Sequence, residues 1–192
     1  MDNLLHQELS DDRVLLRPLQ ASDADMLFQA ASDPSIWEQH PQRDRYQRPQ
    51  FDAFFAGALE APAAFVIIDI ASNAVIGSSR FYHCSDTERN RYADAIPDMH
   101  DAICIGYTFL IPSFWGGTTN RSVKRLMVTR ALQRYSTVLF QIGENNLRSR
   151  ISIERLGATL ATARDHVACE SSLATPHVLY FIHRSQLASL AF

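Results

Sequence analysis

The sequence predicts a mixed α/β fold in a single domain, residues 1–192, with a central, mostly antiparallel sheet and helices on both faces. A strand, a glycine loop, a helix and a second strand follow one another over residues 105–142, and this order requires a parallel strand pair. Two β-rich runs upstream, joined by a short polar turn, favour an antiparallel hairpin. No repeat, linker or low-complexity tract divides the chain, which is long enough to bury a core.

The N-terminal part predicts a strand, a helix and a loop. Arg13–Leu19 has the composition of a strand entered after a polar leader. Ser22 is placed to cap a helix over Asp23–Ala31, whose acidic first turn suits the helix dipole. Ser32–Arg48 is polar and contains prolines, so we expect a loop or a short helix there.

A second helix and the hairpin are expected next. Proline favours the first turn of a helix, and Pro49 opens a helical pattern that runs to Ala61. Its large apolar side chains are expected in the core: Phe51, Phe54, Phe55 and Leu59. Ala64–Ile70 and Val75–His83 form the hairpin. Ser85–Asp101 is polar and charged, so we expect an exposed and partly mobile excursion.

The centre of the chain has features of an anion site. The apolar run Ala102–Ile111 ends before Pro112, a loop with Gly116 and Gly117 follows, and a helical pattern begins near Thr119. Such a junction directs several backbone N–H groups to one point, and the helix dipole adds partial positive charge there, which suits a phosphate or pyrophosphate.

The charges of this helix support the same interpretation. They are all basic: Arg121, Lys124, Arg125, Arg130 and Arg134. Arg121 and Lys124 lie in or beside the first turn, where the dipole disfavours cations. An anionic ligand at the glycine loop would offset that cost.

The C-terminal part completes the sheet. Thr137–Ile142 is predicted as a short buried strand. Asn145 or Asn146 can cap a helix that ends at Leu156, with Gly157 as its C-terminal stop. The last two predicted strands are Thr159–Val167 and His177–His183.

Composition limits the class of protein. Hydrophobic residues make up 46% and charged residues 20%, as in globular domains. No apolar run approaches the ~20 residues of a membrane span, and no basic stretch precedes an apolar one at the N-terminus, so we expect a cytoplasmic protein without membrane attachment. Cys84, Cys104 and Cys169 lack the spacing of a zinc site or a disulfide framework and are expected to be reduced.

Charge is distributed unevenly along the chain. Residues 1–111 carry a net charge of −9 and residues 112–192 a net charge of +6. The basic half holds the glycine loop, and the acidic half could attract a cationic amine. Aromatic residues do not interleave with the arginines, so nucleic acid is not an expected partner. We expect a monomer or a homodimer.

The glycine loop and the segment after it resemble those of the GNAT family of acyl-CoA-dependent N-acetyltransferases, and within it the branch of ribosomal-protein N-terminal acetyltransferases. The residues that carry the resemblance are Gly116, Gly117, Asn145, Asn146, Ser149 and Gly157. The family's cofactor loop has the form Gln/Arg-x-x-Gly-x-Gly/Ala, and the matching positions are Trp115, Thr118 and Asn120, so larger residues replace the small ones. The resemblance implies a GNAT fold with a splayed parallel pair, acetyl-CoA as co-substrate, and a primary amine, either a protein N-terminus or a small molecule, that attacks the thioester directly.

The resemblance also implies which residues bind the co-substrate. The backbone of Phe109, Leu110 and Ile111 is assigned to pantetheine, as is the side chain of Asn146. The pyrophosphate site is assigned to Gly116, Gly117, Thr118, Thr119 and Asn120, with Arg121 as a phosphate contact.

Catalytic residues are harder to assign. Many GNAT members supply the acid from a tyrosine seven residues after the asparagine, and that position is Ile153 here. Ser149 matches a serine near the thiol in the N-terminal acetyltransferase branch, and its hydroxyl could donate a proton. Glu144 follows a predicted strand and is the first candidate base; His83 and Asp101 are the runners-up. A base is not required if the amine loses its proton to water.

Acceptor recognition is expected in the segment between the first strand and the second helix. Trp37 and Tyr46 of that segment, with Tyr82, are the candidate substrate-binding residues. A non-catalytic acyl-CoA-binding or interaction module remains an alternative, because Ile153 replaces the tyrosine. A nucleotide-binding α/β protein is a second alternative, although no Gly-x-x-x-x-Gly-Lys loop is present. The sequence predicts neither the acceptor nor the length of the acyl group.

Overall fold

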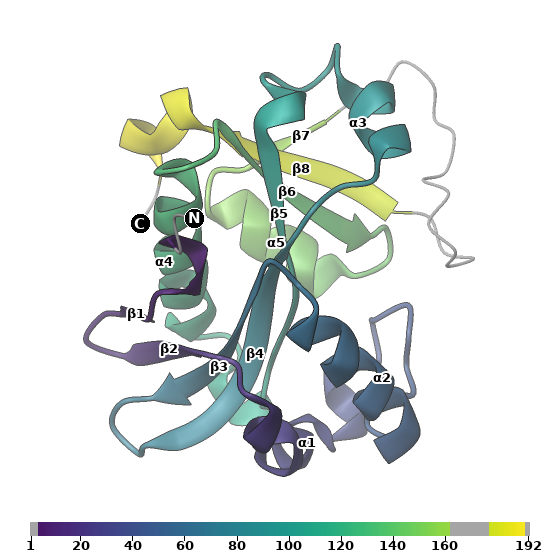
Figure 1. Cartoon of the computed structure of the whole chain (residues 1–192), viewed down its shortest axis with the longest axis vertical. Coiled ribbons are helices and arrows are strands. Elements are labelled where there is room, and N and C mark those ends of the chain that lie inside the picture. Colours follow the sequence, from purple (N-terminus) through teal and green to yellow (C-terminus); the bar gives the residue numbers. More distant parts are fainter. Residues whose placement is uncertain (1–3, 162–176, 191–192) are drawn as a thin grey trace.

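The computed structural model describes residues 4–161 and 177–190, which form an eight-stranded sheet with helices around it (Figure 1). The strands are β1 (Leu9–Ser10), β2 (Val14–Pro18), β3 (Ala63–Asp69), β4 (Ala74–Tyr82), β5 (Ala102–Leu110), β6 (Thr137–Gly143), β7 (Thr159–Leu160) and β8 (His177–His183). The α-helices are α1 (Ala24–Ala31), α2 (Arg48–Leu59), α3 (Asp86–Tyr92), α4 (Thr119–Leu132) and α5 (Leu147–Arg155).

The strand order is β1-β2-β3-β4-β5-β6-β8-β7. All pairings of described strands are antiparallel except β5 with β6. The helix α4 joins these two strands, as a parallel crossover requires. The predicted fold class, a mixed and mostly antiparallel sheet with one parallel pair, is confirmed.

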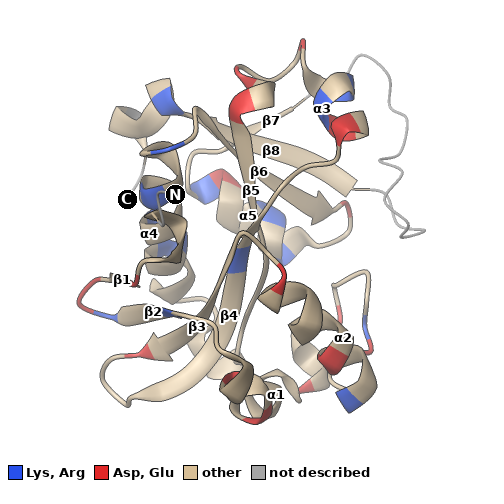
Figure 2. Cartoon of the chain, viewed as in Figure 1, with Lys and Arg blue, Asp and Glu red and all other residues tan. Residues whose placement is uncertain are grey.

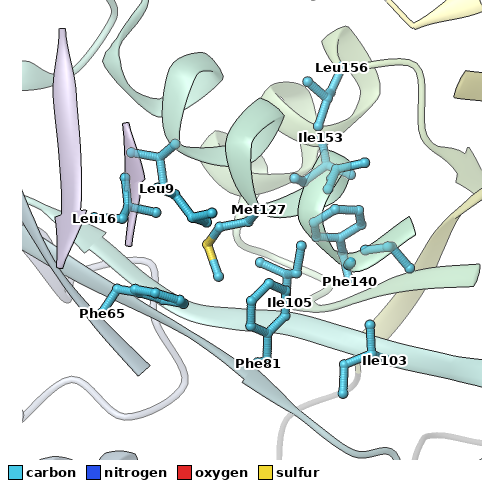
Figure 3. Packing of buried hydrophobic residues seen from close by; sticks show 14 of the residues in the cluster. Leu9, Leu16, Phe65, Phe81, Ile103, Ile105, Met127, Phe140, Ile153 and Leu156 are labelled. Atoms are coloured by element: carbon cyan, nitrogen blue, oxygen red, sulfur yellow. The ribbon is translucent and has the colours of Figure 1, made fainter. Parts of the chain in front are cut away.

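Helices cover both faces of the sheet. On one face α4 and α5 bury Met127 and Ile153 against Phe81 and Ile105 of the strands (Figure 3). On the other face α1 and α2 pack over β4 and β5, and the region of α3 buries Cys104. Ile105 and Cys104 are neighbours on β5, and successive strand side chains point to opposite faces. The alternation of apolar residues along β5 therefore positions both helical layers.

The start of α1 corrects one prediction. The cap is not Ser22, because a short 3-10 helix, Ala21–Asp23, leads directly into α1. The buried carboxylate of Asp23 instead accepts a hydrogen bond from the Gln20 N–H (2.8 Å) and pairs with Arg17 (2.7 Å). It thereby ties α1 to β2.

Residues 85–101 are also more ordered than expected. Ser85 and Glu88 form a capping box at the start of α3. Ile96 and Met99 are buried beside α3, so the expectation of an exposed excursion is wrong for this part. Thr159 begins a strand as predicted, whereas residues 162–167 of that predicted strand lie outside the described residues.

Cys84 and Cys104 are free thiols and buried, and Cys169 lies outside the described residues. Within residues 4–161 and 177–190, no helix has both the length and the apolar composition that crossing a bilayer requires.

Gly77→Ala should destabilise the fold. A Cβ at Gly77 would lie 2.0 Å from the backbone oxygen of Phe109, so β4 and β5 would have to separate. Overpacking of this kind costs ~1–3 kcal/mol, which lowers the melting temperature by ~2–12 °C in a chain of this size. Gly117→Ala is the control, because its Cβ meets no atom within 4 Å. Equal melting temperatures of the two variants by circular dichroism would contradict this packing.

Candidate active site

The parallel strands β5 and β6 pair at only three positions, from Ala102 with Thr137 to Cys104 with Leu139. Beyond them the strands diverge, which is the expected splay, while β5 stays paired with β4 and β6 with β8. A bulge in β5 accompanies the divergence, where Tyr107 has a φ of 53°. The β6-facing backbone groups of Ile105–Leu110 therefore have no strand partner.

A cavity of about 490 Å³ opens at this divergence. Its walls come from β5, β6, the glycine loop, the helices α4 and α5, and the loop that precedes α2. The predicted site residues that line it are Trp37, Phe109, Leu110, Gly116, Gly117, Asn120, Arg121, Asn146 and Ser149. Residues far apart in the sequence thus meet in one cavity.

The glycine loop and α4 leave backbone donors open to the cavity. Gly116 has a φ of 72°, which favours glycine. A Cβ at either Gly116 or Gly117 would meet no protein atom within 4 Å, so the space over the loop is free. No side chain caps α4 at Thr118. The N–H groups of the first turn are therefore available to a ligand.

Polar groups continue along the start of α5. Asn146 caps this helix, and its Oδ1 accepts a hydrogen bond from the Ser149 N–H (3.2 Å). Asn120 donates from Nδ2 to Ser152 Oγ (2.7 Å), whereas its buried Oδ1 has no partner. A buried acceptor without a donor is costly, and Asn120 is one of the residues that line the cavity.

The charge of the lining is entirely positive. The described lining residues include five cations and no aspartate or glutamate; the cations are Arg45, Arg121, Lys124, Arg148 and Arg155. Figure 2 shows the basic residues of α4 and α5 that contribute to this charge. Arg148 lies over the Trp115 ring, 3.8 Å from its centroid. The cavity favours a ligand with several negative charges.

A sequence profile described as "Acetyltransferase (GNAT) domain" matches residues 13–159. The chain belongs to the GNAT acetyltransferase family. It is thus an N-acetyltransferase with acetyl-CoA as co-substrate. A comparison with curated protein sequences finds no match.

Solved structures share the fold. A probable GNAT acetyltransferase from Chromobacterium violaceum is 17% identical, with a TM-score of 0.76 and coverage of 95% of this chain and 89% of that chain. A GCN5-related N-acetyltransferase from Brucella melitensis is 18% identical, with a TM-score of 0.74 and coverage of 95% and 81%. RimJ from Mycobacterium smegmatis, solved with CoA-disulfide, is 13% identical, with a TM-score of 0.68 and coverage of 96% and 90%.

Several predicted co-substrate residues of this GNAT domain lie outside the cavity lining. Thr118 and Thr119 are not among the lining residues, although they belong to the loop and helix start. Ile111 is not available to pantetheine, because its N–H donates to Ile76 O (2.8 Å). Leu110 O likewise accepts from Trp115 Nε1 (2.8 Å), which leaves the backbone upstream of it to face the cavity.

The candidate bases are displaced from the cavity. Glu144 directly follows β6, is exposed and does not line the cavity. His83 is exposed and likewise outside the lining. Asp101 accepts hydrogen bonds from Ser136 N and Oγ (2.9 and 2.7 Å), so it fixes the turn before β6. The expectation that acidic residues attract the amine finds no support in the lining.

The candidate acceptor residues differ in their positions. Trp37 lines the cavity but is buried, and its indole donates to Ala31 O (2.8 Å). Tyr46 lies outside the lining and accepts from Gln47 Nε2. Tyr82 is also outside it, and burial raises the pKa of its hydroxyl well above the ordinary value. Ile153, at the position of the family tyrosine, lines the cavity and packs in the core.

Several lining residues were not predicted from the sequence, among them His40, Arg45, Arg148 and His177, and the burial of Lys124 was not predicted either. For Lys124 a signal was present, since it shares the helical spacing of the buried residues Val128 and Ala131. Lys124 is buried, and its Nζ donates to Thr108 Oγ1 (2.5 Å). Burial lowers the pKa of Lys124 to about 7.

Lys124→Met should stabilise the protein at low pH only. The unfolded chain keeps this amine protonated up to its ordinary pKa of 10.5, whereas the folded protein loses the proton near 7. The cost of burying the charge is therefore full below pH 7, shrinks as the pH rises through that interval, and is absent above it. The melting temperature of the variant should exceed that of the wild type by several degrees at about pH 6, and the gap should close by about pH 10.

Arg121→Met is the control for this measurement. Arg121 is exposed on the same helix and pays no cost of burial, so the effect of its substitution on the melting temperature should not vary with pH. A Lys124→Met gap that is constant with pH would contradict a buried, depressed lysine.

Proposed function

We propose that this GNAT domain transfers the acetyl group of acetyl-CoA to a primary amine that enters the cavity between β5 and β6. The observation that carries the proposal is the cavity itself. It joins the glycine loop, a helix start without a side-chain cap and the diverging strands, and none of its described lining residues is an aspartate or glutamate. Each feature suits one part of acetyl-CoA. The glycine loop and the cations suit its phosphates, and the unpaired backbone of β5 suits the amides of its pantetheine arm.

The residues that would hold the co-substrate follow from this fit. The N–H groups from Gly116 to Arg121 would bind the pyrophosphate, and Arg121 and Arg148 would add charge at the phosphates. The backbone of Phe109 and its neighbours in β5 would bind the pantetheine amides. The unpartnered Oδ1 of Asn120 is an acceptor for a ligand N–H.

Acetyl-CoA supplies the acetyl thioester, and the protein must position a neutral amine and manage protons. Ser149 lines the cavity beside the Asn146 cap, and we assign its hydroxyl as the proton donor to the leaving sulfur. The positive wall itself replaces a dedicated base, because nearby like charges lower the pKa of a bound amine. Glu144 then has no part in proton transfer.

The acceptor class remains a choice between a protein N-terminus and a small amine. The structural likeness to RimJ supports testing N-terminal peptides alongside amino acids and polyamines. The test is a thiol-release assay over this amine panel, together with calorimetry of acetyl-CoA. Binding with release on at least one amine class supports the proposal. Binding without release on any of them would favour a non-catalytic acyl-CoA-binding module.

Gly117→Asp should weaken acetyl-CoA binding without unfolding the domain. The new carboxylate would meet no protein atom at Cβ, but it would stand where the phosphates are bound. Two like charges 4 Å apart repel by about 1 kcal/mol in water and about 4 kcal/mol near a protein surface, so the Kd should rise ~10-fold or more. Gly117→Asn has the same shape without the charge and is the matched control. Equal calorimetric Kd values for Asp and Asn would exclude phosphate binding at this loop.

Ser149→Ala should lower turnover with the Kd of acetyl-CoA nearly unchanged. A general acid acts in the transition state and contributes ~100- to 10,000-fold. Ser149→Thr keeps a hydroxyl and should retain most of the activity. A kcat within about threefold of wild type for the alanine variant is below the range of a general acid and would mark Ser149 as structural.

A further inference from the structure

Two buried arginines lie beside the cavity without a carboxylate partner. Arg45, from the loop before α2, is 5% exposed, and Arg80, from β4, is 8% exposed. Arg17, Arg48 and Arg125 form ion pairs with aspartates, whereas neither Arg45 nor Arg80 pairs with a carboxylate of the described residues. Burying a charge is costly unless it is paired and fully hydrogen-bonded, so two such cations together need an explanation.

Aromatic rings account for part of their surroundings. Arg45 Cζ lies 4.8 Å from the centroid of Phe54 and 5.5 Å from that of Tyr107. Arg80 Cζ lies 3.4 Å from the Tyr107 centroid and 5.6 Å from that of Phe54. The guanidinium groups therefore share two rings, yet Arg45 Nε and both Nε and Nη1 of Arg80 have no hydrogen-bond partner. Rings supply cation–π attraction but no acceptor for these N–H groups.

His40 lies at the same place. Its Nδ1 is 2.9 Å from the Gln42 backbone nitrogen, which donates, and 3.3 Å from the Gln42 carbonyl oxygen. Burial and the charge of Arg45 lower the pKa of His40 to about 3, so the ring is neutral. Its Nε2 lies 3.3 Å from Arg45 Nη1. When the Gln42 N–H donates to Nδ1, the one proton of the neutral ring is on Nε2, and two donors then face each other at this contact.

These donors belong to the cavity wall. His40, Arg45 and Tyr107 all line it, and they come from different elements than the glycine loop and α4, which we assign to the phosphates. An anion on this wall would accept from Arg45 and His40 and neutralise the buried charge. Carboxylate matches the planar fork of a guanidinium with two parallel hydrogen bonds.

We propose that Arg45 and His40 bind a carboxylate carried by the acceptor, so that the amine substrate of this enzyme is an amino carboxylate. The inference rests on the proposed function and names its substrate class. Arg80 does not contact the carboxylate in this proposal; it packs against the same Tyr107 and Phe54 rings as Arg45 and helps to position them. The source of the carboxylate, a free amino acid or an acidic peptide, is distinguished by the test below.

The test compares acceptors that differ only in the carboxylate. Thiol release is measured with free amino acids, their amides, the corresponding decarboxylated amines, and peptides with and without an acidic residue near the N-terminus. Charge-assisted hydrogen bonds to the carboxylate should raise kcat/KM over the matched amide by ~10- to 150-fold. If only free amino acids show the preference, the carboxylate that binds is that of a free amino acid. If only acidic peptides show it, the carboxylate is that of an acidic side chain near the peptide N-terminus.

Variants of Arg45 test whether this residue causes the carboxylate preference. Arg45→Met should remove the preference, while the calorimetric Kd of acetyl-CoA stays within about twofold of the wild-type value. Arg45→Lys should restore part of the preference. Arg48→Gln is the matched control, because Arg48 is exposed, pairs with Asp25 and Asp52, and lies outside the lining. Melting temperatures establish that each variant is folded.

Product binding to the wild-type protein tests the same inference without relying on turnover or on variants. With CoA present, wild-type protein should bind an N-acetyl amino acid ~10-fold or more tightly than the N-acetyl amide. Acetylation of amines with no carboxylate preference in either assay would overturn this inference and leave the proposed function standing. A protein that neither binds acetyl-CoA nor acetylates any amine would overturn both.

Discussion

Strands β5 and β6 share three paired positions and then diverge, and the whole site depends on that divergence. The bulge at Tyr107 turns β5 away while β4 holds its other edge. The opening exposes backbone groups that a continuous sheet would pair, and it admits side chains from α4, α5 and the loop before α2. The core beneath stays closed, because Ile105, Phe140 and Ile153 pack against α4 (Figure 3).

The charges around this opening determine which ligands it can bind. Among the described residues, the charged side chains that line the cavity are all cations, which repel one another, and burial penalises two of them, Arg45 and Lys124. Lys124 responds by a pKa lowered to about 7. Arg45 packs against aromatic rings, and its Nη2 donates to Gln42 Oε1. Anionic ligands offset this repulsion, which favours binding of acetyl-CoA and of an amine that carries a carboxylate.

The fold and one wall of the site could be predicted from the sequence. The strand, glycine loop and helix around Gly116 have local signals: an apolar run, a proline, paired glycines and basic residues on the helix. The wall formed by the loop before α2 has no such local signal. His40 and Arg45 lie in an irregular loop without periodicity, and a charged residue such as Arg80 normally indicates a solvent-exposed position. Glu144 was misplaced for a related reason, because the end of a strand indicates proximity to the cavity but not the direction of the side chain.

Hydrogen exchange measured by mass spectrometry, with and without saturating acetyl-CoA, tests the central claim most directly. If the co-substrate lies in the divergence, amides of β5 from Ile105 to Leu110 and of the segment from Gly116 to Arg121 should exchange more slowly in the complex. Amides of β1 and β2, at the far edge of the sheet, should not change. Protection absent from both segments in a protein saturated with acetyl-CoA would contradict the account.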